Sequence, residues 1–194
     1  MEEALIKKAI ARDISAIEAL YDQYAPTLLS VCFRYCGNRD DAEDILHDGF
    51  IKIIQNIHTF KIRSGATLEA WMRRVMVNTA LNFLRTRSKE KNFVDINPIL
   101  DTIDIHDEDV SDPEEIYLQV DREKILELIC DLPAGYRTVF NLYVFEQYGH
   151  KEIAELLGCS ENTSKSQLSK ARGLLRKKIN KLVNVKTTPA YEKV

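Results

Sequence analysis

Hydroxyl, amide and ammonium side chains are concentrated in one segment of the 194-residue sequence, KEIAELLGCSENTSKSQLSKA, which runs from Lys151 to Ala171. Small hydroxyl groups let a helix enter the major groove of DNA, while lysines and a glutamine supply phosphate contacts and donors to base edges. This chemistry predicts a helix that reads DNA. Its candidate contacts are Thr163, Ser164, Lys165, Ser166, Gln167, Ser169, Lys170 and Arg172.

Apolar residues at helical spacing predict how this segment is held. On a helix that begins near Glu161, the inward stripe contains Leu168, Ala171, Leu175, Ile179 and Leu182. A short helix over 150–157 precedes it, Gly158 permits a left-handed turn, and Ser160 caps the second helix. This order is typical of a helix-turn-helix. Two packed helices with a lysine-rich surface are the alternative, although basic residues continuing to Lys181 favour DNA.

A second polar stripe lies upstream, in LEAWMRRVMVNTALNFLRTRSK. Offsets of three or four residues place an aromatic ring, two amides and three cations on one face: Trp71, Arg74, Asn78, Asn82, Arg85 and Lys89. Bases stack on such a ring while cations follow the backbone, which suits a separated nucleic-acid strand. The core face would contain Leu68, Met72, Val75, Met76 and Phe83. A buried tryptophan beside ordinary exposed cations explains this segment equally well when it is taken alone.

An acidic helix is predicted over 40–57. Its inward residues would be Ala42, Leu46, Gly49, Phe50, Ile53 and Ile57. Its outward residues would be Asp41, Asp44, His47, Asp48, Ile51 and Gln55. Acids around an exposed isoleucine suit a protein partner better than DNA. A face that is merely solvated is the alternative.

The sequence offers little for catalysis. His47-Asp48 is the dipeptide of helical metal-dependent phosphohydrolases, but His58, His106 and His150 fall at a helix end, in a linker and at a cap. Cys32 and Cys36 share a helical face without further ligands at similar spacing, so buried packing is the favoured interpretation. We therefore expect no enzyme, no metal site, no cofactor and no disulfide.

The predicted fold is all-α, with two small helical domains joined by an acidic flexible linker. Helices are predicted over 2–12, 15–36, 40–57, 67–87, 114–130, 134–146, 150–157 and 161–182, with Asp13 as a cap, Pro26 as a break or bend and Gly37-Asn38 as a stop. The predicted boundaries are a first domain over 1–88, a linker over 89–113, a helix-turn-helix domain over 114–182 and a frayed tail over 183–194.

Charge is distributed unevenly along the chain. From Asp95 to Asp131 thirteen acidic residues stand against two basic ones, a balance of −11 in a chain of net charge −3, so the remainder carries +8. Basic modules of this size often bind polyanions, with solvated surface charge as the alternative. No apolar run is long enough for a membrane, and EEALIKKAIARD after Met1 is no secretory signal. These features predict a cytoplasmic location without membrane insertion.

Together, two stretches resemble the RNA polymerase sigma factors of the extracytoplasmic-function (ECF) type, which keep only conserved regions 2 and 4. The first comprises LYDQYAPTLLSVCFRYCGNRDDAEDILHDGFIKI and WMRRVMVNTALNFLR. The second is LPAGYRTVFNLYVFEQYGHKEIAELLGCSENTSKSQLSKARGLLRK. The resemblance covers about 13–88 and 129–178, most of the chain outside the acidic connector. One departure is Gly149, where relatives usually have a serine cap.

The resemblance implies a function and partners. The helix over 40–57 would bind the clamp helices of core RNA polymerase, while the helix from Trp71 to Lys89 and the loop FKIRSGAT would open the −10 element and capture an extruded base. The helix from Glu161 would enter the −35 element, and the connector would pass near the RNA exit path. An anti-sigma factor is a further implied partner. A helix-turn-helix repressor is the rival interpretation, although it leaves the Trp71 stripe and the acidic helix unexplained.

Overall fold

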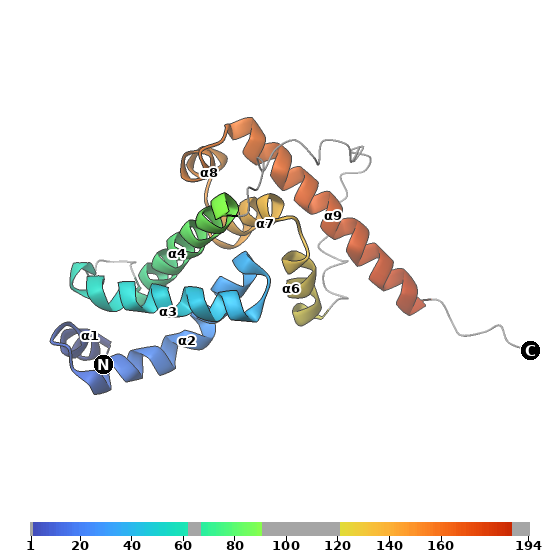
Figure 1. Ribbon diagram of the computed structural model, residues 1–194. Coiled ribbons are helices and arrows are strands. Elements are labelled where there is room, and N and C mark those ends of the chain that lie inside the picture. Colours follow the sequence, from blue (N-terminus) through green and yellow to red (C-terminus); the bar gives the residue numbers. More distant parts are fainter. Residues whose placement is uncertain (1, 62–66, 91–120, 188–194) are drawn as a thin grey trace, which may run out of the picture. The chain divides into compact units, whose positions relative to one another are not determined.

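The protein folds into two helical units in the computed structural model, which describes residues 2–61, 67–90 and 121–187 (Figure 1). Side chains at 88–90, 122 and 184–187 are outside this description, as are residues 91–113 of the predicted 89–113 linker and residues 188–194 of the predicted 183–194 tail. Unit 1 spans Met1–Phe93 and unit 2 spans Val94–Val194. The described residues form helices and turns and no strand, as the predicted all-α class requires.

Unit 1 is built on three long helices that pack against one another. The elements are α1 (Glu2–Ile10), α2 (Ile14–Cys36), α3 (Arg39–Asn56), a 3₁₀ turn (Ile57–Thr59) and α4 (Leu68–Glu90). Asp13 caps α2 by accepting a hydrogen bond from the amide of Ala16 at 3.0 Å. Gly37 ends α2 with φ 79°, and Asn38 then caps α3 through the amide of Asp41 at 2.9 Å.

Pro26 does not break α2, so of the two effects predicted for this residue, a break or a bend, the break is wrong. The helix continues through this residue for 23 residues in all. Proline has no amide hydrogen, so one intrahelical hydrogen bond is missing there. Pro26 is exposed, whereas its neighbours Ala25 and Leu28 are buried, and the packing of α2 against α3 and α4 outweighs the lost bond.

The core of unit 1 lies between α2, α3 and α4. Its largest fully buried side chains include Leu20, Leu28, Tyr35, Ile45, Ile53, Met72 and Met76. All six residues predicted to face inward from the acidic helix are buried. Gly49 allows α3 and α4 to approach closely, because a Cβ atom at that position would overlap the sulfur of Met76.

Unit 2 contains four helices and a short π-helix in its described part. They are α6 (Arg122–Cys130), α7 (Ala134–Phe140), the π-helix (Asn141–Phe145), α8 (His150–Leu157) and α9 (Glu161–Thr187). The predicted helix over 134–146 is thus α7 followed by a π-helical turn, and α9 runs past the predicted end at Leu182. Of the predicted 114–130 helix, residues 114–120 lie outside the description.

The link between α8 and α9 has the expected turn chemistry. Gly149 caps α8, and its amide donates to Glu152 Oε2 at 2.8 Å. Gly158 ends α8 with φ 69°, a conformation that favours glycine. Ser160 Oγ then accepts a hydrogen bond from the amide of Thr163 at 3.0 Å. The buried core of unit 2 contains Leu142, Ile153, Leu168, Ala171, Leu175 and Ile179.

Candidate nucleic-acid interfaces

The polar stripe on α4 lies at the surface of unit 1. Arg74, Asn78, Asn82 and Arg85 are exposed, and Trp71 is half-buried. Arg85 Nη1 donates to Asn82 Oδ1 at 3.0 Å, so these two side chains are ordered together. Lys89, the last member of the predicted stripe, has a side chain outside the described part. The stripe therefore combines a partly covered aromatic ring with exposed amides and cations.

A hollow of about 380 Å³ lies at the Trp71 end of this stripe. It is lined by Thr59, Phe60, Lys61, Thr67, Ala70, Trp71 and Arg74. The rings of Phe60 and Trp71 lie 5.7 Å apart between centroids, tilted by 47°. An aromatic wall with cations beside it can receive a flat, polar base next to a phosphate. Residues 62–66 of the predicted capture loop are outside the description.

Most of the predicted acidic face of α3 is exposed. Asp44, His47, Asp48 and Gln55 face solvent, and Ile51 is 45% exposed. Tyr21 of α2, which the sequence analysis did not select, adds a second exposed apolar side chain, and its ring meets Phe50 of α3 edge-on at 4.9 Å. The signal that could have identified Tyr21 is a large aromatic at an outward position of α2.

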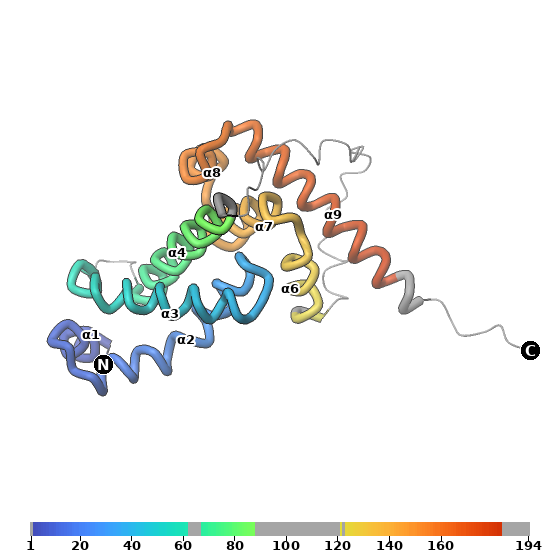
Figure 2. The backbone as a smooth tube through the Cα atoms, viewed as in Figure 1, coloured from blue at the N-terminus to red at the C-terminus, as the bar shows by residue number. Residues whose placement is uncertain are grey.

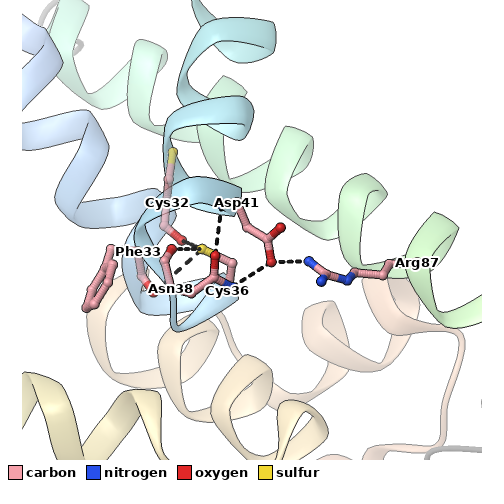
Figure 3. Close-up of polar contacts among 6 residues, drawn as sticks. All are labelled: Cys32, Phe33, Cys36, Asn38, Asp41 and Arg87. Carbon is pink, nitrogen blue, oxygen red and sulfur yellow. Dashed lines mark hydrogen bonds and ion pairs between the residues drawn. The ribbon is translucent and has the colours of Figure 1, made fainter. Parts of the chain in front are cut away.

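Asp41 differs from the other predicted residues of this face. Its side chain is only 17% exposed and forms an ion pair with Arg87 of α4. Asn38 Nδ2 also donates to Asp41 Oδ2 at 2.6 Å. Figure 3 shows Arg87 reaching from α4 to this carboxylate beside the α2–α3 junction. Asp41 therefore joins α3 to α4, a role that its place on the acidic helix did not suggest.

The predicted reading face of α9 divides into exposed and buried residues. Lys165, Ser166, Ser169 and Arg172 are exposed, and Thr163 and Lys170 are partly exposed. Lys165 pairs with Glu161 at 2.8 Å, and this hydrogen-bonded pair lowers the pKa of the Glu161 carboxyl. A carboxylate in the first turn is also favoured by the helix dipole.

The structure corrects the prediction for two members of this face. Ser164 is fully buried and Gln167 is 8% exposed, so both side chains turn into unit 2. Ser164 precedes Leu168 by four residues and Ala171 by seven, which places it on the apolar stripe. Its hydroxyl lies 2.9 Å from His150 Nδ1 on α8. The helical angle of Ser164 could have identified it as a packing residue.

Tyr143 of the π-helix and His150 of α8 stack on each other and contact α9, the proposed DNA-reading helix. Their rings stack with centroids 4.7 Å apart and planes 25° apart, and the guanidinium carbon of Arg172 lies 5.7 Å from the Tyr143 centroid. Together with the His150–Ser164 hydrogen bond, these contacts connect the π-helix, α8 and α9. Arg172 is thus directed toward Tyr143, although it remains exposed.

The thiols and acids form no metal site among the residues that the structure describes. Cys32 is buried, its Sγ lies 3.9 Å from Met76 Sδ, and burial raises its pKa to about 12. Burial also raises the pKa of Cys159. Within the same described ranges, no helix combines the length and the apolar character needed to cross a membrane.

Comparisons with known proteins match both units. The family model for Sigma-70 region 2 matches residues 20–90, and that for Sigma-70 region 4 matches residues 122–175. Sigma factor SigV of Bacillus subtilis is 31% identical over 151 residues, covering 78% of this chain and 83% of the relative. An ECF RNA polymerase sigma-E factor of Haemophilus influenzae is 28% identical over 186 residues, covering 94% and 97%.

A solved structure has the same fold. It is the sigma factor RpoE of Bartonella quintana in complex with the anti-sigma factor NepR, with a TM-score of 0.50 and 22% identity. The match covers 87% of this chain and 98% of that one. The likeness agrees with the all-α architecture of two helical units.

Proposed function

Because this chain belongs to the ECF type of RNA polymerase sigma factors and directs transcription initiation, we propose how its surfaces divide that work. Region 2 corresponds to unit 1 and region 4 to unit 2. The strongest support is the presence of both matched regions, in this order, in one chain whose exposed faces differ in chemistry. The acidic face of α3 suits protein, whereas the cationic faces of α4 and α9 suit DNA.

The exposed face of α3 binds core RNA polymerase. Asp44, His47, Asp48 and Gln55 surround Ile51, so a partner with an apolar centre and a basic rim is complementary. The ion pair between Asp41 and Arg87 joins α3 to α4, so we assign Asp41 a role in positioning this face. Tyr21 extends the apolar part of the surface toward α2.

The stripe on α4 opens the −10 element. Arg74 and Arg85 follow the strand backbone, Asn78 and Asn82 hydrogen-bond to bases, and the hollow beside Trp71 receives an extruded base. Extruding a base costs a few kcal/mol, on the order of what stacking on an aromatic ring returns. The half-buried position of Trp71 supports this role, because its ring contacts Phe60 and also lines the hollow.

The exposed part of α9 enters the major groove of the −35 element. Thr163, Ser166, Ser169 and Lys170 are the proposed contacts, while Ser164 and Gln167 pack inside unit 2. Lys165 and Arg172, which are engaged with Glu161 and Tyr143, contribute positive charge near the phosphates. A groove reader built on the α8–α9 turn follows the usual docking geometry of a helix-turn-helix.

Family membership supports the remaining proposed assignments. The factor acts in the cytoplasm with core polymerase and promoter DNA, and it has no catalytic residues of its own. An anti-sigma factor that covers the polymerase-binding surfaces holds the protein inactive; the solved structure of similar fold, RpoE in complex with the anti-sigma factor NepR, supports this proposal.

The decisive experiment is transcription reconstituted from core polymerase, this protein and a genomic DNA library, with start sites determined by sequencing. We expect starts that share one −35 and one −10 sequence and that vanish without the protein. Strong, selective binding of the protein alone to a duplex operator, with no starts in the reconstituted reaction, would contradict the proposal.

A further inference from the structure

The outward face of α9 continues beyond the part that a major groove can hold. From Ser166 to Lys177 the helix rises about 16 Å, because each residue adds about 1.5 Å. A major groove is about 12 Å wide. The region 4 match ends at residue 175, whereas α9 ends at Thr187. Figure 2 shows the coloured part of α9 as one uninterrupted helix.

Lys177 and Lys181 lie on the same side of α9 as Ser166 and Lys170. Offsets of seven and eleven residues return to one face of a helix, and this face is opposite the buried stripe of Leu168, Ala171, Leu175 and Ile179. Both lysines are exposed. In the described part of the chain neither forms an ion pair, whereas Lys178, turned toward α6, pairs with Asp131 at 3.1 Å.

Gly173 lies between these lysines and the groove-reading residues. A glycine inside a helix costs about 1 kcal/mol relative to alanine. Its backbone does not have the positive φ that would require glycine. On the outward face, the missing side chain lets the backbone of α9 approach another surface closely. A phosphate strand at the edge of the major groove is such a surface.

We propose that Gly173, Lys177 and Lys181 form a phosphate-binding extension of the reading helix. The two ammonium groups contact the backbone of duplex DNA that flanks the −35 element, while Gly173 crosses the strand at the groove edge. The ligand is the phosphate backbone, so this extension adds affinity without sequence preference. The inference rests on the proposed function, because it requires α9 to enter the −35 groove.

The test measures how salt weakens promoter binding by polymerase reconstituted with the full chain. Each phosphate contact contributes about 0.9 to the slope of log affinity against log salt. We expect the Lys177→Gln/Lys181→Gln double variant to lower this slope by about 1.8 and to leave base preferences in the −35 element unchanged. The Lys124→Gln/Lys178→Gln control removes the same charge from two lysines of unit 2 that already pair with Glu127 and Asp131, and we expect a much smaller change.

Two further experiments distinguish a DNA contact from a protein contact: shortened duplexes and a Gly173 variant. On duplexes shortened to the edges of the −35 element, the double variant and the parent should bind alike; a persisting difference would indicate a contact with protein and overturn the inference.

Gly173→Gln should weaken binding to the full-length duplex while unit 2 stays folded, which circular dichroism measures. If the parent discriminates −35 sequences but the double variant keeps the parental slope, only this inference fails. If the parent shows no −35 discrimination, the proposed function itself fails.

Discussion

Arg87 of α4 forms an ion pair with Asp41 of α3, so the helix proposed to bind polymerase is fastened to the helix proposed to open DNA (Figure 3). The same carboxylate accepts a hydrogen bond from Asn38, which caps α3. The guanidinium of Arg87 also lies 5.8 Å from the Phe83 ring centroid. One side chain of α4 thereby helps to fix where α3 begins.

A double-mutant cycle between these residues should show coupling. Arg87→Ala and Asp41→Asn each remove the pair, and we expect a coupling energy of about 0.5–1 kcal/mol in urea unfolding, because the pair is partly exposed. Both variants should also weaken assembly with core polymerase to a similar extent, since Asp41 positions α3. Strict additivity of the two stability changes would show that the pair is unimportant in solution.

Charge reversal on the open part of α3 should affect polymerase binding without affecting stability. Asp48 is exposed on the proposed face, so Asp48→Arg should lower co-purification with core polymerase at least tenfold and change unfolding by less than about 0.5 kcal/mol. Glu43→Arg is the matched control, because Glu43 is exposed on another side of the same helix and pairs with Arg39. Equal losses for both variants would contradict the assigned face.

Trp71→Ala should impair promoter opening more than polymerase assembly. The ring forms one wall of the hollow opposite Phe60, and losing a stacked base costs about 1–3 kcal/mol. Permanganate footprinting of thymines in the −10 element measures the open complex directly. Trp71→Phe keeps an aromatic wall and should retain most of the opening. Unchanged footprints in Trp71→Ala would show that the Trp71 ring is not needed to open the −10 element.

Periodicity predicted much of the fold because it reports burial. All six inward residues predicted for α3 are buried, and α8 has its predicted bounds. The prediction for Ser164 was wrong because its chemical type was weighed above its angle on the helix. The π-helix after α7 was missed because it inserts a local change of pitch that a 3.6-residue pattern does not reveal.

Contacts between distant residues could not be predicted from spacing. Asp41 and Arg87 are 46 positions apart, and nothing local to either residue specifies the other. The same holds for His150 and Ser164, where a residue taken for a simple helix start proves to support the reading helix. Phe60 and Trp71 were both selected, but the hollow between them follows only from how the 3₁₀ turn meets α4.

Ser164→Ala should disturb the reading helix through His150. The change removes a buried hydroxyl and leaves His150 Nδ1 without this hydrogen bond, so we expect about 1 kcal/mol of destabilisation and weaker −35 binding. Ser169→Ala is the control within α9, because that hydroxyl is exposed and its loss should not change stability. Full stability in Ser164→Ala would show that the α8–α9 hydrogen bond is dispensable.

Unit 1 should lose stability at alkaline pH through Cys32. Burial raises the pKa of this thiol from an ordinary 9.0 to about 12, so the unfolded chain releases the proton first as the pH rises. The stabilising contribution is complete below pH 9 and is lost progressively toward pH 12. Tyr24, whose pKa is raised to about 12 by burial and by its hydrogen bond with Glu2, acts in the same direction from its ordinary value of 10.0. Urea unfolding between pH 8 and 11 should therefore show a steeper decline in the free energy of unfolding for the parent than for Cys32→Ala, which has no thiol to ionise.

The same protonated, buried thiol of Cys32 should resist iodoacetamide in the native protein and react in urea, because the thiolate is the nucleophile. Rapid native labelling of Cys32, or parallel pH profiles for the parent and the variant, would show that the thiol is not held in the core between α2 and α4.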